Sequence, residues 1–431
     1  MRRISETVVP ARLGKPFRWL LASSWTTNLG DGIAVAAGPL LVASLTSDPF
    51  LVSMAALLGW APPLVFGLWA GALTDRLNRR TLVVVADGSR AVILAGLVAT
   101  MATGTISVGV ALAAVGLLAT AEVFADNSTQ TLTPTLVHRD DLVVANARLQ
   151  TGFITMNQLA GPSVGAVLFA VGRTWPFVTQ AVLVTAGVLL IARVRLPVNE
   201  RGDVVRHSVL RDVIEGVRWT MRHAAVRTLV LTILIFNFTF GAAWSVLVLY
   251  TQRQLGMGDI GYGVMTTVGA LGGLLGTALY GWITRRVSLG NVMRAGLILE
   301  TLTHLGLALT RSPVVAGVIF FLFGAHAFIW GTTSITIRQR AVPSHLQGRV
   351  GSVNGICVYG GLVVGSAIGG VLATHWGVTA PFWFGFGGSL VFVLLLWREM
   401  RHIAHDAPPP DEADPVTTPT APSPVDHAPP A

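Results

Sequence analysis

Several ionisable side chains lie inside long segments that are otherwise apolar. Asp31, Arg90 and Glu122 are the ones whose types and depth suit proton transfer. A charged side chain at the centre of a bilayer costs about 2.5–3.5 kcal/mol on insertion scales, so each one invites a functional hypothesis. A carboxylate couples transport to protons when burial and a nearby cation change its proton affinity between two states. Asp31 and Glu122 are therefore our candidates for the proton carrier, and Arg90 is our candidate for the cation.

Structural roles are the alternative for these residues. Asp31 lies between Gly30 and Gly32, where a helix-packing hydrogen bond would explain it, and a fixed ion pair would explain Glu122. Asp87 lies three residues before Arg90 at the end of the same segment. For four further residues we expect structural roles: Asp126 as a partner of loop arginines, Glu300 and His304 as a pair four residues apart, and His326 as a packing histidine with satisfied ring nitrogens.

The composition indicates a membrane protein. Of 431 residues, 52% are hydrophobic and only 12% are charged, whereas a soluble domain has about 25% charged residues. A membrane helix needs about 20 mostly apolar residues. Twelve segments of that kind lie at residues 17–45, 51–73, 82–103, 106–126, 145–171, 174–192, 228–252, 260–283, 290–311, 313–337, 348–374 and 379–398. We therefore expect an all-α membrane protein with twelve transmembrane helices.

The basic residues predict the orientation. Most arginines flank the apolar segments on one side, together with both termini and the long middle loop, and the opposite loops hold only Arg173, Arg253 and Arg311. The positive-inside rule then places both termini in the cytoplasm. Although the net charge is +9, its spread over membrane-flanking turns argues against a nucleic-acid partner. Lys15 is the only lysine, which is typical of a GC-rich bacterium; we expect the bacterial cytoplasmic (inner) membrane.

An internal repeat divides the chain. Gly161 and Gly165 recur as Gly365 and Gly369, 204 residues later, and a second echo of Gly71 follows at an offset of 210. Two six-helix halves around a midplane site are typical of transporters. We expect a first half over residues 1–192, a cytoplasmic linker over 193–227, a second half over 228–400 and a disordered tail over 401–431. Apolar residues at helical spacing predict a linker helix, which lies either on the anionic inner leaflet or in water.

The turn GALTDRLNRR, which begins at Gly71, resembles the cytoplasmic signature G-x-x-x-D-R-x-G-R-R/K of the major facilitator superfamily. Gly71, Asp75, Arg76, Arg79 and Arg80 match the signature. Asn78 replaces its inner glycine, and asparagine tolerates a left-handed turn.

The resemblance implies that this turn is a cytoplasmic gate. Gly71 lets its helix pack closely against a neighbour, and Asp75 faces the helix N-terminus near Gln347–Arg349, where a carboxylate is favoured. Arg79 and Arg80 pair with carboxylates in adjoining loops. A positive-inside turn with no gating role is the alternative.

Other stretches resemble the branch of this superfamily that holds macrolide efflux pumps and the enterobactin exporter. They are NLGDGI from Asn28, ADGSR from Ala86, TPTLVHRDDLVVANARLQ from Thr133 and QRAVPSHLQGRV from Gln339. LAGPSVG, with Gly161, Pro162 and Gly165, resembles the antiporter signature of the fifth helix, and Pro162 predicts a kink there. In this superfamily the first and fourth helices line the central cavity, which would place Asp31 and Glu122 beside it.

The resemblance implies a proton-coupled exporter of amphipathic small molecules that works by rocking of its two halves. A siderophore or metabolite exporter, an importer or passive facilitator, and a non-transporting scaffold or sensor are the alternatives. The chain has no GxxxxGK[ST] loop and a single cysteine, Cys357, so we expect no enzyme, no cofactor and no metal. The expected partners are the substrate, protons and membrane lipid, around a monomer. Our candidates for an apolar substrate cavity with few polar anchors are Trp25, Asn28, Asn157, Gln158, Asn237, Trp244 and Trp330.

Overall fold

The computed structural model describes residues 11–194 and 209–397, and every regular element in these two ranges is helical. The first half comprises α2 (Gly14–Leu45), α3 (Pro49–Arg76), α4 (Arg79–Ala102), α5 (Val108–Leu136), α6 (Leu142–Gly152), the π-helix η3 (Phe153–Ala160), α7 (Gly161–Val171) and α8 (Trp175–Ile191). The second half comprises α10 (Ala224–Trp244), α11 (Leu247–Leu249), the π-helix η4 (Tyr250–Gln254), α12 (Asp259–Thr284), α13 (Leu289–Leu309), α14 (Pro313–Ala341), α15 (Gln347–Trp376) and α16 (Ala380–Leu396). Between the halves lies α9 (Val209–Arg222).

All twelve predicted apolar segments are helical in this structure. Within the described residues, ten helices are long and apolar enough to cross a membrane, with α6, η3 and α7 forming one continuous span. The remaining two, α8 and α16, are apolar but shorter. The all-α membrane fold is therefore confirmed, while the count of twelve membrane crossings stays a prediction.

Side-chain caps begin several of the helices. Asp48 accepts a hydrogen bond from the backbone of Phe50 at the start of α3, and Ser312 begins α14 in the same manner. Asn78 begins α4 by accepting from Thr81 N–H at 3.2 Å, with φ of −69°. The expectation of a left-handed turn at Asn78 was therefore wrong: asparagine is favoured there because its side chain caps the next helix.

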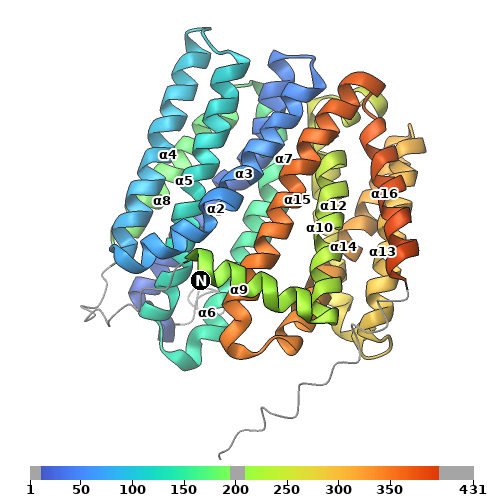
Figure 1. The fold of residues 1–431 in the computed structure, drawn as a ribbon. Coiled ribbons are helices and arrows are strands. Elements are labelled where there is room, and N and C mark those ends of the chain that lie inside the picture. Colours follow the sequence, from blue (N-terminus) through green and yellow to red (C-terminus); the bar gives the residue numbers. More distant parts are fainter. Residues whose placement is uncertain (1–10, 195–208, 398–431) are drawn as a thin grey trace, which may run out of the picture.

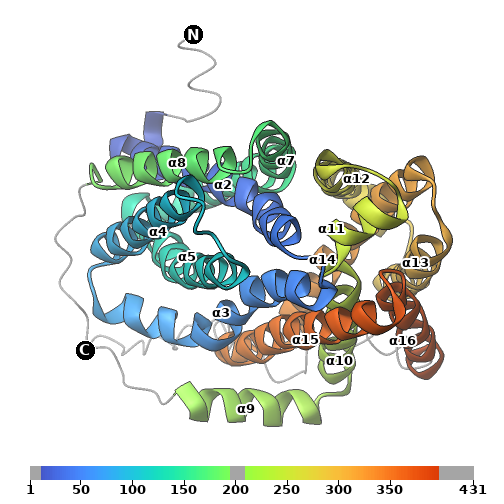
Figure 2. The same cartoon turned by 90° about the horizontal axis from the view of Figure 1, so that it is seen from above.

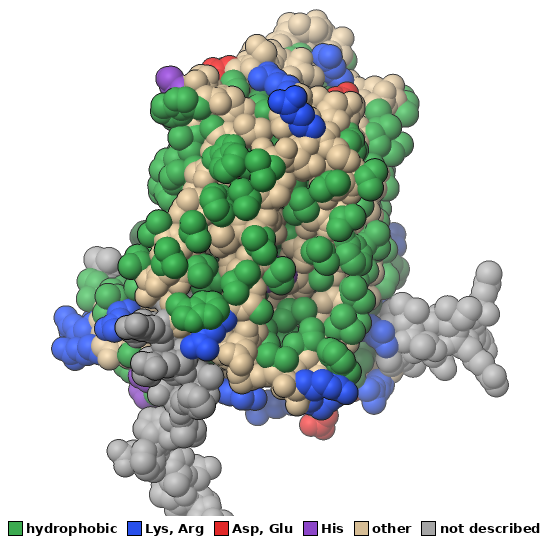
Figure 3. Space-filling view, turned by 90° about the vertical axis from the view of Figure 1, so that its right-hand side faces the viewer, with side chains coloured by type: hydrophobic (Ala, Val, Ile, Leu, Met, Phe, Trp, Pro, Cys, Tyr) green, Lys and Arg blue, Asp and Glu red, His purple; other side chains and the backbone are tan. Residues whose placement is uncertain are grey.

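The two halves lie side by side and meet along two pairs of helices. α3 packs against α15, and α7 packs against α12 (Figures 1 and 2). α9 runs crosswise to the spans at one end of the bundle, beside α15 (Figure 1). Hydrophobic side chains cover the middle of the face shown in Figure 3, and most basic side chains lie near its two ends. This distribution suits a protein whose middle band faces lipid.

Close glycine contacts hold α7 against α2. A Cβ atom on Gly161 would lie 2.6 Å from the carbonyl carbon of Gly32, and one on Gly165 would lie 3.0 Å from the Cα of Ile33. Because backbone atoms cannot move aside as a side chain can, only glycine permits this separation. These two positions belong to the predicted antiporter motif, whose glycines therefore have a packing role.

The repeated glycines make the same contact in the second half. Gly365 on α15 approaches the backbone of Phe238 and Ala242 on α10, and Gly369 approaches Ala242 one turn further along. The internal repeat thus corresponds to a repeated helix crossing, α2 with α7 and α10 with α15. Small residues allow such close approach between membrane helices.

The helix geometry changes just before Pro162. η3 is a π-helix, and the backbone N–H of Gly161 bonds to the carbonyl of Met156, five residues back. Proline has no N–H to offer its helix, and π-helical turns are a known response to a disturbed hydrogen-bond ladder. The expected irregularity at Pro162 therefore takes the form of a π-helical stretch.

The two ends of the bundle differ. One hydrophobic cluster includes residues of both halves, among them Val42 and Ala166 with Leu247 and Tyr250, and lies at the end opposite α9. Toward the α9 end, the clusters of buried residues that the structure describes each belong to a single half. Among the described residues, buried hydrophobic contact between the halves is therefore concentrated at the end opposite α9.

We predict opposite effects for two alanine substitutions on α15. Gly365→Ala places a methyl group 3.0 Å from the backbone nitrogen of Ala242 and should cost about 1–3 kcal/mol of stability through overpacking. Gly360→Ala meets no atom within 4 Å and should stabilise the helix by about 0.5–1 kcal/mol. Thermal unfolding of the two variants in detergent micelles checks this. Equal unfolding temperatures would show that the glycine contact is not a constraint.

Candidate functional site

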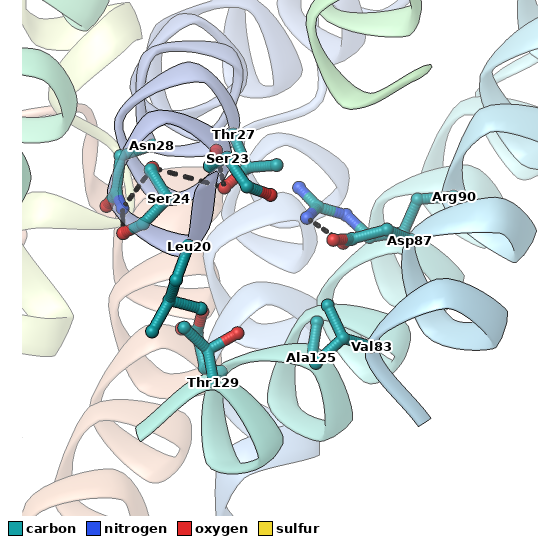
Figure 4. A pocket seen from close by; sticks show the side chains of 11 residues that line it. Leu20, Ser23, Ser24, Thr27, Asn28, Val83, Asp87, Arg90, Ala125 and Thr129 are labelled. Atoms are coloured by element: carbon teal, nitrogen blue, oxygen red, sulfur yellow. Dashed lines mark hydrogen bonds and ion pairs between the residues drawn. The ribbon is translucent and has the colours of Figure 1, made fainter. Parts of the chain in front are cut away.

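A polar cleft lies between α2, α4 and α5. Its interior volume is about 20 Å³, which is room for about one water molecule. The side chains around it come from the α9-facing halves of the three helices, and Figure 4 shows them converging on one space. The charged ones are Asp87, Arg90 and Asp126, and the polar ones are Ser23, Ser24, Thr27, Asn28 and Thr129.

Arg90 is the centre of an ion-pair network at the wall of this cleft. It donates from Nη2 to Oδ1 of Asp31 on α2, and from Nη1 to Oδ1 of Asp87 at 2.9 Å. The relative exposure of Arg90 is 2%, that of Asp31 is 7% and that of Asp87 is 3%. Both predicted candidates, Asp31 and Arg90, are thus in direct contact, and Asp87 is a partner that we had not assigned to the site.

Two carboxylates on α5 lie near this network. Glu122 and Asp126 are close enough to act electrostatically on Asp87. Asp126 is exposed at the cleft and Glu122 is half-buried. Asp126 lines the cleft with Asp87 and Arg90, and its predicted pairing with loop arginines stays a prediction, because the side chain of Arg76 lies outside the described residues. Two carboxyl groups therefore contact the Arg90 guanidinium and two more lie nearby, so the site holds more carboxyl groups than cations.

The structure shows the local contacts of the predicted cavity residues, and their role in a substrate cavity stays a prediction. Among them only Asn28 lines the cleft, and its amide donates to the carbonyl of Ser24 at 2.7 Å. Trp25 donates to the carbonyl of Arg148 and lies against Gly152. The remaining candidates lie away from this cleft: Asn157 approaches Gly32 through its backbone, Gln158 is half-buried on η3, Asn237 donates to Ile233, and Trp244 and Trp330 belong to an aromatic cluster.

The gate motif is partly described. The side chains of Asp75 and Arg76 lie outside the described part of the structure, so their predicted roles remain predictions. Gly71 makes no close approach, because a Cβ there would meet no atom within 4 Å. The predicted tight packing at Gly71 is therefore not seen among the described residues.

Arg79 and Arg80 bind carbonyl groups, and their predicted pairing with carboxylates of adjoining loops stays a prediction, because the side chain of Asp75 and residues 195–208 lie outside the described part of the structure. Arg79 donates to the carbonyl of Thr131 at 3.0 Å, and Arg80 donates to that of Ala192. Carbonyls near the C-terminal ends of helices carry partial negative charge and attract cations. The two arginines therefore tie the α3–α4 turn to α5 and α8 within the first half.

The second half has its own buried ionisable residues at related positions. Glu300 follows Arg90 by 210 residues, and His326 follows Glu122 by 204, the two offsets of the internal repeat. Nδ1 of His304 lies 3.5 Å from Oε1 of Glu300, as the predicted pair requires. His326 packs against Phe236 and Phe323 as predicted, and backbone groups of Phe323 and Gly296 lie beside its ring.

The described residues contain no group of three His, Cys, Asp or Glu side chains arranged to hold a metal ion. The site is a pair of buried ion pairs beside a polar cleft in a helical membrane bundle. Ionisable groups at such a depth are rare in membrane helices and mark candidate functional sites.

Comparison with known proteins defines the class of this protein. The chain belongs to the transmembrane secretion effector family of the major facilitator superfamily, which matches residues 6–424. It is similar to the multidrug efflux pump Tap of Mycolicibacterium fortuitum, with 28% identity over 386 residues that cover 85% of this chain and 91% of the relative. It is also similar to macrolide efflux protein A of Streptococcus pyogenes, with 23% identity over 364 residues, 81% of this chain and 87% of the relative. The chain is thus a transporter and not an enzyme.

Solved structures share the fold. The nucleoside transporter NupG has a TM-score of 0.68 and 12% identity, covering 90% of this chain and 100% of that one. A bacterial homologue of the iron transporter ferroportin, in its inward-facing state, has a TM-score of 0.69 and 17% identity, covering 91% of this chain and 99% of that one. At such identities the likeness shows the major facilitator fold alone.

We predict that Arg90→Gln strongly destabilises the protein. Removing the cation leaves Asp31 and Asp87 buried without a counter-charge, and breaking a buried pair in this way costs about 3–5 kcal/mol. Adding Asp31→Asn and Asp87→Asn to the same chain should restore much of the loss, because the orphaned charges are then gone. The unfolding temperature in detergent measures both the destabilisation by Arg90→Gln and its recovery in the triple variant. An Arg90→Gln variant as stable as the wild type would contradict the buried network.

Proposed function

We propose that this protein is a proton-coupled exporter of amphipathic small molecules of the drug or macrolide type. The two relatives named above are a multidrug pump and a macrolide efflux protein, and the cleft supports a substrate that carries positive charge. Export by proton exchange needs one site at which a cation and a proton compete. The observation that carries the proposal is Arg90 held between Asp31 and Asp87, beside the carboxylates of Glu122 and Asp126.

The physical argument rests on charge balance. One guanidinium cannot neutralise four carboxylates, so protons or a bound cation must supply the rest in a low-dielectric interior. Asp126 is exposed at the cleft and is the first to meet water from that side. In our proposal, protonation of Asp31 or Asp87 weakens its pair with Arg90, and the guanidinium then turns toward Glu122 or Asp126. Binding of a cationic substrate reverses that shift.

Alternating access supplies the movement. Among the described residues, the hydrophobic contact between the halves is concentrated at the end opposite α9, which supports an inward-facing state if α9 lies in the cytoplasm. The two six-helix halves, over residues 1–192 and 228–400, would then rock about the α3–α15 and α7–α12 contacts. Contacts that exist in one state only bias such an equilibrium, and the turn at Gly71, which is loosely packed here, is proposed to tighten in the other state.

We propose that the protein works in the bacterial inner membrane with both termini in the cytoplasm. The positive-inside distribution of arginines supports this orientation, because it places α9 and the α3–α4 turn on the same side. The cleft then opens to the cytoplasm, where a drug would be collected for export.

Transport in inside-out vesicles tests the function. With an imposed pH gradient, we predict that vesicles containing the wild type accumulate ethidium or erythromycin. Glu122→Gln and Asp126→Asn should lower this uptake to that of vesicles without the protein, because each removes a charge at which the Arg90 guanidinium and the cationic substrate compete. If Asp31 is the proton carrier, Asp31→Asn should also lower uptake to that of vesicles without the protein. If Asp31 only packs α2 against α4, uptake by this variant should still depend on the pH gradient.

Asp140→Asn is the matched control. It is the same chemical change in a loop, at a side chain with 90% relative exposure, so it should transport like the wild type. Uptake that ignores the pH gradient in every variant would contradict proton coupling. No uptake across a broad panel of compounds would favour a siderophore or metabolite exporter, or a protein that does not transport.

A further inference from the structure

The helix α9 is fixed to the second half by its inner face. Nε of Arg349, in the first turn of α15, lies 2.9 Å from Oδ1 of Asp212, and Nη1 lies 2.8 Å from Oε1 of Glu215. A Cβ on Gly216 would lie 2.6 Å from the carbonyl oxygen of Arg349, so the two backbones are in close contact. Trp219 packs against the cluster at the start of α10. The position of α9 is therefore coupled to that of α15.

The outer face of α9 has two exposed stripes. Ile214, Val217 and Met221 have relative exposures of 49%, 42% and 50%, and their spacing of three and four residues places them on one line of the helix. Three exposed arginines form the neighbouring stripe at spacings of seven and four residues: Arg211, Arg218 and Arg222. Nothing in the described part of the chain covers either stripe.

We propose that this outer face binds the anionic phospholipid surface of the inner leaflet. An apolar stripe beside an arginine stripe is the pattern of a helix that lies in the membrane interface. The positive charges of the arginines complement the negative charge of anionic phospholipid headgroups. The place of α9 agrees with this partner. It lies crosswise to the spans at the end of the bundle (Figure 1), level with the first turn of α15, which begins a membrane helix.

A soluble partner fits the surface less well. Three arginines that have no free carboxylate near them among the described residues would favour an acidic protein, but such a partner must also reach an apolar stripe at the membrane boundary. The only exposed acidic side chain on this helix, Glu215, is already bound to Arg349. A lipid surface binds both stripes at once. This proposal rests on the cytoplasmic orientation proposed above.

The mechanical consequence concerns α15. This helix packs along α3, one of the two contacts between the halves, and its first turn is held by α9. A lipid surface that holds the outer face of α9 therefore restrains the end of α15 that must move when the halves rock. Anionic lipid would act on the transport cycle without entering the cleft.

Spin-label quenching in nanodiscs tests the proposal on the full chain. In a Cys357→Ser background, Val217→Cys carries an environment-sensitive fluorophore, and Asp140→Cys carries the same fluorophore as an exposed loop control. The discs contain either phosphatidylcholine alone or a mixture with phosphatidylglycerol, each with a lipid that bears a doxyl group on its acyl chain. We expect quenching at position 217 but not at 140, and stronger quenching at 217 when phosphatidylglycerol is present.

The arginines are tested by a charge-matched pair of variants. Arg211→Gln, Arg218→Gln and Arg222→Gln together should remove the dependence on phosphatidylglycerol, whereas the control with Arg285→Gln, Arg286→Gln and Arg340→Gln should keep it. These residues are all exposed, so neither triple variant should unfold the protein.

A fluorophore at 217 that is unquenched and as accessible to aqueous iodide as the one at 140 would overturn the proposal. So would an unchanged lipid dependence in the first triple variant. Proton-coupled transport is not assayed here, so failure of this proposal leaves the transport proposal standing.

Discussion

The rest of the first half depends on how Arg90 is kept inside a membrane. A guanidinium with 2% exposure is tolerated there only beside carboxylates, so α2 must bring Asp31 against α4 while Asp87 completes the pairing. The residues that flank Asp31 make this possible. Gly30 lies near Gln180 on α8, and Gly32 lies against the backbone of Asn157 and Gly161, so three helices approach the same turn of α2. The electrostatic constraint and the glycine contacts are therefore two parts of one arrangement.

The two halves share their packing but differ in chemistry. The glycine crossing of α2 with α7 recurs as that of α10 with α15, yet the place of Arg90 is taken in the second half by Glu300. There the neighbours are aromatic: Trp244 stacks on Phe240, and Trp330 stacks on Phe236. The internal repeat accounts for the shared helix packing. The repeat is not kept at the position of Arg90 and Glu300, so the first half has an ion-pair network where the second half has an aromatic cluster.

Features that depend on the local sequence pattern could be predicted from the sequence. Apolar length predicted every helical span, and depth with residue type singled out Asp31 and Arg90. Features that depend on neighbouring helices were missed. Asp87 was not assigned to the site, because its part in the network depends on α2 bringing Asp31 to Arg90. The stacking of Trp330 on Phe236 depends in the same way on a neighbouring helix, α10. The predicted tight packing at Gly71 is not seen among the described residues, because a close approach depends on where the neighbouring helices lie.

Competition between substrate and proton at the carboxylates around Arg90 is the central claim, and proton release on binding measures it most directly. Purified protein in detergent and weakly buffered solution, with a pH indicator, is mixed with ethidium. We predict that binding releases protons from the wild type near the pH at which the site is partly protonated, and that Glu122→Gln with Asp126→Asn abolishes this release. Ethidium that binds without releasing protons at any pH would contradict the account.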